Sequence, residues 1–560
     1  MVNKKINEWK SFEKLDEALK EELFKMNEEE LFDAFYVDLA FGTGGMRGVL
    51  GPGTNRMNIY TIRKANYGFG KYILSVNSEN PSVVIAYDSR NNSTLFAEES
   101  AKVLASLGIK VYLFDKITPT PELSFAVRYL KATGGIVVTA SHNPPVYNGY
   151  KIYDETGCQL VPDLANIVID EISKAPNPFE MDLPCINCFK KSGMVEIIGK
   201  QVDEAYLEKV KSISVNNPNK EDFKVVFTPL HGTSSYLGER LLTECGYNVI
   251  PVKEQMVADP LFSTVVLPNP EDKRAFDLSV KYAKENGADI CIATDPDADR
   301  VGLAVKNGDE YVLLTGNQTG ALLIDYLVKN RKIDKKAVLF NTIVTSNLGA
   351  EIARKAGIDV FSTLTGFKFI GEQARKLEGT DKMFYFGYEE SYGYVVCDFV
   401  RDKDSLQALL LCSEMACFYK NQGKTLIEVL DEIYQEFGYY GEALVNINLA
   451  GASGAARITR ILNYFRTLET LDSEKLVVVA KEDYELSKRV DANGESEITL
   501  PKSNVIKYFL NDGSWFALRP SGTEPKMKVY ISSVGKTEEL SKKRIKEIEE
   551  EVLKIVNGVE

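Results

Sequence analysis

Residues 82–114, SVVIAYDSRNNSTLFAEESAKVLASLGIKVYLF, indicate the fold class of this chain. The stretch opens with the apolar run Ser82–Tyr87, which is typical of a buried strand, and continues into a helical pattern from Leu95 to Leu107. A second β-rich run, Lys110–Phe114, follows directly. A strand, a helix and a strand in this order are typical of a layered α/β domain.

The same layout recurs twice further along the chain. Helical patterns that end near Cys245 and Ala356 separate further apolar runs. We therefore predict three related α/β domains, with strands at 82–87, 110–114 and 135–139, at 223–227 and 289–293, and at 336–340 and 383–386.

The last part of the chain has a different pattern. Its apolar runs are closely spaced, and Asn511-Asp-Gly513 is favourable for a hairpin between two of them. A long charged amphipathic helix is expected over 538–556, so this part is predicted to be an α+β domain. The predicted strands are 505–509, 514–518 and 526–530, and the predicted domains are 1–208, 209–318, 319–440 and 441–560.

Length and composition favour a multidomain globular protein. A chain of 560 residues is too long for one hydrophobic core, and 44% hydrophobic with 26% charged residues is the balance of a soluble protein. No apolar run is long enough to cross a bilayer, and the start of the chain has no apolar signal core. We expect a cytoplasmic protein without membrane attachment.

Charge and cysteine content exclude two further classes. A net charge of −13 argues against a nucleic-acid binder, although a small site can be locally positive and bind a phosphorylated substrate. The 8 cysteines do not form a disulfide framework in a chain of this length. Cys185 and Cys188 form the one close pair; we interpret them as two ordinary thiols in a loop, with a redox or metal role as the alternative.

The loop Thr139–Lys151 (TASHNPPVYNGYK) follows a predicted strand and carries a candidate nucleophile. Its prolines stiffen the turn around Ser141, His142 lies beside that hydroxyl, and Lys151 follows ten positions later. A capped turn is the alternative. The chain has only 2 histidines, His142 and His231. Both lie in loops that contain proline and glycine and follow a predicted strand, which favours a functional loop over a plain capped turn.

The loop Thr294–Arg300 (TDPDADR) carries three carboxylates at alternate positions, Asp295, Asp297 and Asp299. These oxygens can converge on one hard cation. An EF-hand is excluded because Arg300 and Lys306 occupy the positions that need glycine and glutamate. The remaining alternative is a solvated acidic turn, which is costly at the end of a buried strand without a counter-ion.

Three further segments carry weaker signals. Gly387–Gly393 (GYEESYG) reads as an extended loop, on which Glu389 and Ser391 share a face and suit vicinal hydroxyls of a sugar. Arg519–Pro525 (RPSGTEP) offers a guanidinium, two hydroxyls and an open backbone to phosphate oxygens, with a plain turn as the alternative. In Gly42–Arg47 the glycines let the backbone and the arginine approach an anion, but no Walker motif is present.

In this order and over the whole chain, the four main motifs resemble those of the α-D-phosphohexomutase superfamily. Thr-Ala-Ser-His-Asn-Pro-Pro resembles its phosphoserine loop and Asp-Pro-Asp-Ala-Asp-Arg its metal loop. Gly-Tyr-Glu-Glu-Ser-Tyr-Gly resembles its sugar loop and Arg-Pro-Ser-Gly-Thr its phosphate loop. The resemblance implies four domains around a central cleft.

The resemblance also implies roles for individual residues. Ser141 is expected to carry a phosphoryl group, and Asp295, Asp297 and Asp299 to hold Mg²⁺ together with it. His142, Lys151, Arg47, Arg300 and Lys403 fall at positions of catalytic residues. The expected substrate contacts are Thr365 and Gly366 in the loop for substrate discrimination, Glu389 and Ser391 for sugar hydroxyls, and Arg519, Ser521, Gly522 and Thr523 for the non-reacting phosphate.

The implied reaction moves a phosphoryl group from Ser141 to a sugar monophosphate and takes the other phosphate back from the bisphosphate. Lys151 and His142 are both candidates for the base that accepts the sugar hydroxyl's proton. The Glu-Glu-Ser form of the sugar loop resembles phosphoglucomutases more than phosphomannomutases. Glucose phosphate with glucose 1,6-bisphosphate as activator is therefore expected, and pentose phosphate is the rival.

Two functions other than that of a mutase are possible, and the oligomeric state is open. A silent sugar-phosphate-binding paralogue would lack the nucleophile or the metal ligands, and this chain has both. A phosphatase that uses Ser141 would release inorganic phosphate, whereas a mutase conserves it. The expected partners are small sugar phosphates, with a monomer or a homodimer as the assembly.

Overall fold

The structure is a computed structural model that describes residues 2–42, 44–333, 336–449, 451–468, 470–471, 473–520 and 526–559. Its contacts divide the chain into two compact units. The first comprises Met1–Val338 and Gly366–Thr425, and the second comprises Leu339–Thr365 and Leu426–Glu560. Among the helices in these ranges, none has the length and apolar content that crossing a membrane requires.

Three short helices precede the first sheet, and the sequence patterns did not predict them. They are α1 (Val2–Ser11), α2 (Glu17–Lys25) and α3 (Glu28–Phe35). Trp9 of α1 is buried, and its ring lies edge-on to those of Phe35 and Tyr60. This small aromatic cluster holds the helices onto the first α/β domain.

The first α/β domain contains a six-stranded mixed sheet in the order β1-β5-β4-β2-β3-β6. Strands β4, β2, β3 and β6 are parallel, and β5 and β1 add antiparallel at one edge. This confirms the predicted α/β layering. The strands are β1 (Gly45–Val49), β2 (Ser82–Tyr87), β3 (Lys110–Phe114), β4 (Gly134–Val138), β5 (Tyr147–Asp154) and β6 (Val195–Ile198).

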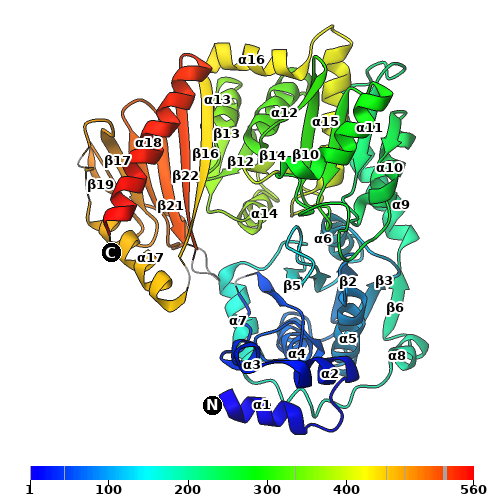
Figure 1. The fold of residues 1–560 in the computed structure, drawn as a ribbon. Helices are drawn as coiled ribbons and strands as arrows, with labels where there is room; N and C mark the ends of the chain where they lie inside the picture. Colours follow the sequence, from blue (N-terminus) through cyan, green and yellow to red (C-terminus); the bar gives the residue numbers. More distant parts are fainter. Residues whose placement is uncertain are drawn as a thin grey trace. The chain divides into compact units, whose positions relative to one another are not determined.

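Helices cover both faces of this sheet (Figure 1). A Cβ added at Gly134 of β4 would meet side chains of α4, whereas one added at the next residue, Gly135, would meet side chains of α6. Successive strand residues point to opposite faces, so α4 and α6 lie on opposite sides. The helices are α4 (Ile59–Val76), α5 (Ser93–Ser106), α6 (Thr120–Tyr129), α7 (Pro162–Ser173), α8 (Ile186–Ser192) and α9 (Lys200–Lys211).

The second α/β domain repeats this plan with a five-stranded mixed sheet, β11-β10-β9-β7-β8. Strand β7 is parallel to β8 and β9, and β10 returns antiparallel to β9. The acidic loop at 295–299 is the turn between β9 and β10. The elements are β7 (Lys224–Thr228), α10 (Ser234–Glu244), β8 (Asn248–Pro251), α11 (Asp277–Asn286), β9 (Ile290–Thr294), β10 (Val301–Asn307) and β11 (Glu310–Leu313).

The third α/β domain follows, and the boundary between the two compact units runs through it. Its helix α15 is buried along almost its whole length, from Ser405 to Tyr419. Asp404 caps that helix by accepting hydrogen bonds from the main-chain nitrogens of Leu406 and Gln407. The elements are α12 (Gly316–Asn330), β12 (Lys336–Thr342), α13 (Asn347–Lys355), β13 (Asp359–Thr363), α14 (Phe367–Lys376), β14 (Lys382–Glu389), β15 (Gly393–Val395) and α15 (Ser405–Lys420).

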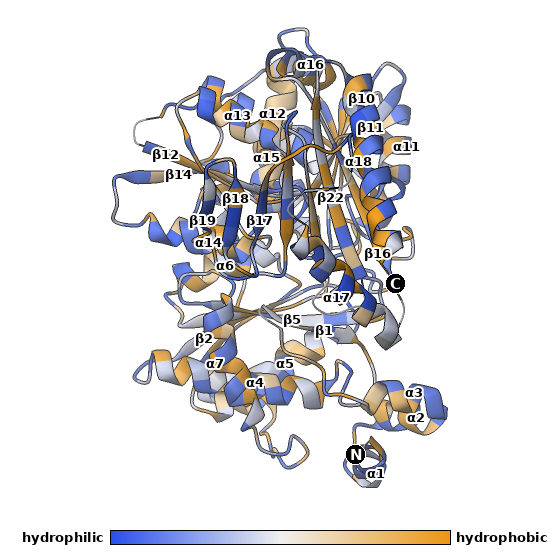
Figure 2. Cartoon of the chain, turned by 90° about the vertical axis from the view of Figure 1, so that its left-hand side faces the viewer, coloured by the Kyte–Doolittle hydropathy of each residue, from blue (hydrophilic) through white to orange (hydrophobic). Residues whose placement is uncertain are grey.

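The last domain is built on a seven-stranded antiparallel sheet in the order β16-β22-β21-β20-β17-β18-β19. Helix α18 turns the stripe Ile548, Val552 and Val556 into the core, and Figure 2 shows hydrophilic and hydrophobic residues mixed along this helix. Helix α16 (Leu426–Phe437) comes before this sheet in the chain. The elements of the domain are β16 (Tyr439–Asn448), α17 (Gly451–Thr467), β17 (Val478–Asp483), β18 (Lys488–Asp491), β19 (Gly494–Glu497), β20 (Ile506–Leu510), β21 (Trp515–Pro520), β22 (Lys526–Gly535) and α18 (Glu538–Gly558).

Candidate active site

Ser141 lies on the tight turn that follows β4, and its backbone is held in the left-handed region at φ +50°. The main-chain nitrogen of Ser141 donates to Oγ1 of Thr139 over 2.8 Å, and the serine is buried. A left-handed serine costs conformational energy that neighbouring contacts must offset. The turn therefore fixes the direction of a hydroxyl that the sequence analysis gave as a candidate nucleophile.

Arg90, which the sequence analysis missed, holds this turn. Its Nη2 donates to the carbonyls of Ser141 and Asn143, and its Nη1 donates to those of Pro144 and Tyr147 over 2.9 and 3.1 Å. One buried guanidinium therefore satisfies four carbonyl groups of the serine loop. The signal was present in the sequence, because Arg90 follows β2 at the same end of the parallel sheet.

A buried carboxylate accompanies Arg90. Asp88 lies 3.4 Å from Nε of Arg90, measured between the nitrogen and Oδ2, and both side chains are fully buried. Oδ1 of Asp88 accepts hydrogen bonds from the hydroxyl of Ser93 and from the main chain of Arg90. The pair anchors the guanidinium to the end of β2.

The acidic loop between β9 and β10 has a defined backbone. Ala298 adopts φ +57°, and Oδ1 of Asp295 accepts the main-chain N–H groups of Asp299 and Arg300 over 3.0 and 2.9 Å. This turn is not a solvated acidic loop, because Asp295, Asp297 and Asp299 are all buried. The alternative that the sequence left open is therefore excluded.

The three carboxylates fit a hard divalent cation. One oxygen from each lies within 4.8 Å of the others, and Oδ1 of Asp297 and Oδ1 of Asp299 are buried without a hydrogen-bond partner. Unpartnered buried carboxylate oxygens are costly unless a cation or a proton compensates them. Burial and the two neighbouring carboxylates raise the pKa of Asp295, which is the expected response of three acids that converge without a metal.

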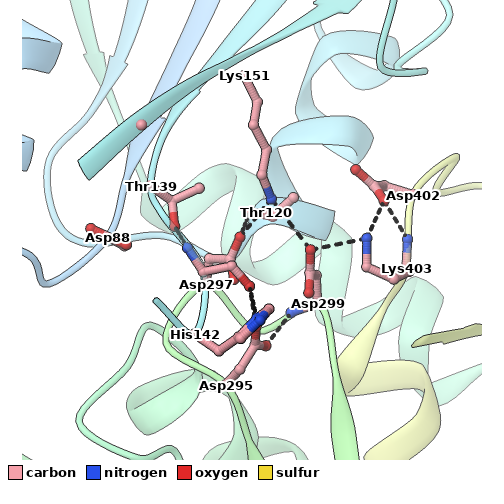
Figure 3. A network of polar contacts seen from close by, with 12 residues as sticks. Asp88, Thr120, Thr139, His142, Lys151, Asp295, Asp297, Asp299, Asp402 and Lys403 are labelled. Carbon is pink, nitrogen blue, oxygen red and sulfur yellow. Dashed lines mark hydrogen bonds and ion pairs between the residues drawn. The ribbon is translucent and has the colours of Figure 1, made fainter. Parts of the chain in front are cut away.

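Ser141 and the acidic loop meet directly. The hydroxyl of Ser141 donates to Oδ2 of Asp295 over 2.6 Å, although the two residues are 154 positions apart in the chain. Thr120, at the start of α6, adds a second link by donating from its hydroxyl to Oδ2 of Asp297 over 3.0 Å. The candidate nucleophile and the candidate metal ligands therefore form one network, of which Figure 3 shows Thr120, Asp295, Asp297 and Asp299.

Two lysines approach the acidic loop from other elements (Figure 3). Nζ of Lys151 lies 2.8 Å from Oδ2 of Asp297, and Nζ of Lys403 lies 3.1 Å from Oδ2 of Asp299. Burial opposes ionisation of Asp297, but Lys151, a hydrogen bond with Asp295 and Lys403 together outweigh it and hold the pKa of that carboxyl well below its usual range. Asp402, a further residue that the sequence analysis did not select, lies 3.2 Å from Nζ of Lys403.

The predicted loop around Lys151 was too long. The structure ends the serine loop at β5, so Lys151 lies within a strand and pairs with Gly45 of β1 and Val137 of β4. The Pro and Gly residues of this segment had suggested a continuous loop. A strand gives Lys151 a more rigid base than a loop does, and Arg47 lies in the adjacent strand β1.

His142 lies beside Ser141, and two arginines lie near its imidazole. Nδ1 of His142 lies 3.2 Å from Oγ of Ser141, and burial together with Arg300 and Arg47 lowers the pKa of the imidazole well below its usual value. Nη1 of Arg47 donates to Asn143 over 2.8 Å, and Arg300 pairs with Glu271. The imidazole is therefore neutral and next to the hydroxyl.

The sugar-loop prediction needs a correction. The segment is a hairpin rather than an extended loop, because β14 continues to Glu389 and pairs antiparallel with β15. Glu389 is buried at the strand end and accepts a hydrogen bond from the main chain of Gly366 over 2.8 Å, whereas Ser391 lies in the turn. The shared-face argument for Glu389 and Ser391 assumed alternate residues of one extended segment, and that assumption was wrong.

The remaining predicted contacts belong to other parts of the chain. Thr365 lies in the second compact unit, and Arg519 lies in β21 of the same unit. Ser521, Gly522 and Thr523 lie outside the described residues. The other histidine, His231, bonds to the carbonyl of Val257 and the hydroxyl of Thr264, so its role is to hold its own loop.

Comparison with known families matches four domain models in order. Residues 38–178, 204–308 and 315–437 match the three α/β/α domains of phosphoglucomutase/phosphomannomutase, and residues 472–555 match the C-terminal domain. The domain boundaries predicted from the sequence stay predictions.

Relatives cover nearly the whole chain. A phosphoglucomutase of Staphylococcus epidermidis is 40% identical over 531 residues, which is 94% of this chain and 96% of that protein. A phosphoglucomutase of Staphylococcus aureus is 40% identical over 92% of this chain and 93% of its own length.

Solved structures agree on the fold. A Thermus thermophilus protein described as a phosphomannomutase superposes with a TM-score of 0.69 at 25% identity, covering 93% of this chain and 100% of its own. A Paramecium phosphoglucomutase in an open form reaches the same TM-score of 0.69 at 18% identity, over 93% and 95% of the two chains. From these matches and the relatives above, the chain belongs to the phosphoglucomutase/phosphomannomutase family, within the α-D-phosphohexomutase superfamily that its motifs resemble.

Proposed function

We propose that this chain is a phosphoglucomutase, an intramolecular phosphotransferase that interconverts glucose 1-phosphate and glucose 6-phosphate. The observation that carries the proposal is 40% identity to curated phosphoglucomutases over 94% of the chain. The Ser141–Asp295 hydrogen bond of 2.6 Å, which joins nucleophile and acidic loop, supports the same chemistry.

Phosphorylated Ser141 acts as the first donor in this reaction. The bond between its Oγ and phosphorus breaks while the free hydroxyl of the glucose monophosphate bonds to the same phosphorus, which gives glucose 1,6-bisphosphate. After the bisphosphate turns over, Ser141 receives the other phosphoryl group and the isomeric monophosphate leaves. The rigid left-handed turn at φ +50° supports this role because in-line transfer depends on direction.

Asp295, Asp297 and Asp299, with Ser141, are the residues that would hold Mg²⁺. The two unpartnered carboxylate oxygens support a cation at this place. When bound, Mg²⁺ supplies positive charge for the oxygens of the transferring phosphoryl group. The choice of Mg²⁺ rests on the family resemblance and on the all-oxygen ligand set.

Four basic residues supply further positive charge to this site. Lys151 and Lys403 contact the acidic loop directly, and burial does not prevent their protonation because Asp297, Asp299 and Asp402 hold their pKa values above the usual range. Arg47 and Arg300 lie on β1 and directly before β10. Positive groups fixed in place stabilise charge on a phosphoryl group without reorganisation during the reaction.

His142 and Lys151 are the two candidates for the base. His142 is neutral and lies 3.2 Å from Oγ of Ser141, whereas Lys151 is held as an ammonium by its two aspartates. The pH dependence of kcat in His142→Gln and Lys151→Arg separates them. The true base is the residue whose substitution removes the acidic limb of the profile, while the other variant keeps that limb.

Substrate recognition is assigned to two groups of residues. We propose that Glu389 and Ser391 contact sugar hydroxyls and that Thr365 and Gly366 contribute to discrimination between sugars. Arg519, Ser521, Gly522 and Thr523 are proposed to hold the phosphate that does not react. The Glu-Glu-Ser form of the sugar loop supports glucose over mannose, and pentose phosphate is the rival substrate. We propose a monomer or homodimer that acts in the cytoplasm.

A coupled assay with glucose 1-phosphate, mannose 1-phosphate and ribose 1-phosphate tests the function. We expect the highest kcat/KM with glucose 1-phosphate and activation by glucose 1,6-bisphosphate. A higher kcat/KM with the pentose would identify a phosphopentomutase, and one with mannose a phosphomannomutase. Release of inorganic phosphate would support a hydrolase, and absence of both phosphoserine and turnover would support a silent binder.

A further inference from the structure

The only two exposed cysteines of the chain lie next to one another. Of the eight cysteines, Cys185 and Cys188 are exposed, and their Sγ atoms are 2.8 Å apart. The main-chain nitrogen of Cys188 donates to the carbonyl of Cys185 over 2.9 Å, so the first turn of α8 fixes the pair, and Cys188 lies in that helix rather than in the predicted loop. The two sulfurs can therefore join with little movement of the backbone.

The other six cysteines are shielded from solvent. Four are buried and two are partly buried, and burial raises the pKa of every one of them, for example to about 12 at Cys291. These six are Cys158, Cys245, Cys291, Cys397, Cys412 and Cys417. Since thiolate is the reactive form, they are poor nucleophiles at neutral pH.

The exposed pair differs from them in reactivity. The hydrogen bond that the two thiols share lowers the pKa of Cys185, with a smaller contribution from Lys191, and raises the pKa of Cys188. One thiol is thus biased toward thiolate and the other toward the protonated form. That division of roles is typical of an attacking and a resolving cysteine.

A metal site fits this pair less well. A metal site needs at least three Cys, His, Asp or Glu side chains that converge. In the part of the chain that the structure describes, Asp295, Asp297 and Asp299 form such a group, and no third ligand of these types converges with the two thiols. Structural zinc sites in proteins use four ligands. Two neighbouring thiols without further ligands favour thiol–disulfide chemistry.

We propose that Cys185 and Cys188 form a thiol–disulfide exchange site that takes small disulfides, such as oxidised glutathione. The thiolate of Cys185 attacks one sulfur of the small disulfide and expels its other half as a thiolate, which leaves a mixed disulfide on Cys185. Cys188 loses its proton and attacks the sulfur of Cys185, and the second half leaves. One small disulfide is reduced to two thiols, and the protein dithiol is oxidised to a disulfide.

The test treats the folded full-length protein with excess oxidised glutathione, in the presence of a chelator that suppresses metal-catalysed oxidation by air. We expect the intact mass to fall by two hydrogen atoms, the two thiols that react under native conditions to disappear, and a peptide map to link Cys185 to Cys188. A reducing agent should restore both thiols.

Single variants test the two roles. Cys188→Ser should accumulate a stable glutathione adduct on Cys185, because no resolving thiol remains. Cys185→Ser should form its adduct on Cys188 several-fold more slowly. Cys245→Ser serves as the control, since its thiol is partly buried, and should behave like the unmodified chain.

Three results would overturn the proposal. The first is survival of both thiols in excess oxidised glutathione, and the second is a mixed disulfide in the unmodified chain that never closes onto Cys188. The third is equal rates of adduct formation in the two single variants, which would remove the distinction between attacking and resolving thiol.

Discussion

Replacing Arg90 with lysine tests whether the guanidinium holds the Ser141 loop in the geometry that the proposed phosphoryl transfer needs. Arg90 donates from two terminal nitrogens to four carbonyls of that loop, and its side chain is fully buried. Arg90→Lys keeps the charge next to Asp88 but brings its donors to one point, so at least two carbonyls lose their partner.

The structure sets the size of both expected effects. A hydrogen bond to a charged group contributes about 1.5–3 kcal/mol, so the loss of two such bonds lowers the free energy of unfolding by about 3–6 kcal/mol before the loop relaxes. Misplacement of a reacting group by about 1 Å costs about a hundredfold in rate. We therefore expect kcat of Arg90→Lys to fall by about a hundredfold, with a much smaller change in KM.

The assay measures glucose 6-phosphate formation at saturating substrate, together with the phosphoserine content of Ser141 by intact mass. Arg63→Lys is the matched control, because Arg63 also pairs with a carboxylate, Glu99, and donates to the carbonyl of Pro178 over 3.0 Å, away from the serine loop. If both variants lose similar stability but kcat of Arg90→Lys stays within about threefold of the parent, the positioning argument fails.

Three further predictions address the nucleophile, the metal and the tail domain. Ser141→Ala should fold normally and lose phosphoserine and more than about nine-tenths of turnover, as measured by intact mass and the coupled assay; a higher residual rate would contradict covalent transfer. Chelation should abolish turnover and Mg²⁺ restore it, and Asp297→Asn should need about 10–100-fold more Mg²⁺ for half-maximal activity; an unchanged titration would exclude Asp297 as a ligand. Burial lowers the pKa of Lys507 to about 8, so the folded domain releases this proton before the unfolded chain does, and its stability should rise between about pH 8 and the ordinary value of 10.5. Urea unfolding followed by Trp515 fluorescence in a Trp9→Phe background should show this rise and its loss in Lys507→Met, and parallel pH curves for the two would contradict it.

Residues at the ends of buried parallel strands were predictable from the sequence. Ser141 and Asp295 both follow short apolar runs, and the carboxyl ends of such strands gather on one side of a sheet. The same rule would have selected Arg90 after β2. Arg90 was not predicted, because a single arginine in a polar loop forms no motif with its neighbours.

The errors have physical causes. Lys151 was assigned to a loop because β5 follows two prolines and contains Gly149, which normally end regular structure. Strand β19 (Gly494–Glu497) has no apolar residue and is fully exposed, so no periodicity marked it. Hydrogen bonds to neighbouring strands, which no local pattern encodes, create both strands.

Side-chain pairing across long stretches of chain was beyond the sequence. The bond between Ser141 and Asp295 spans 154 residues, and that between Lys151 and Asp297 spans 146. Adjacent placement of these loops depends on how complete domains pack. Hence the residue types at the site were predictable from the sequence, but which side chains pair with one another, and which of them carry a proton, were not.

The long span of these contacts has a consequence for synthesis on the ribosome. Ser124 of the first domain contacts the segment that precedes α15. Its hydroxyl accepts a hydrogen bond from the main-chain nitrogen of Arg401, 277 positions later in the chain, and Lys403 lies two residues further on. The serine turn can fold early, yet its acidic partner Asp295 follows 154 positions later in the chain, and Lys403 later still. A nascent chain that stalls before Asp295 would carry Ser141 without the acidic loop, and one that stalls before Lys403 would lack one of the two lysines that contact that loop.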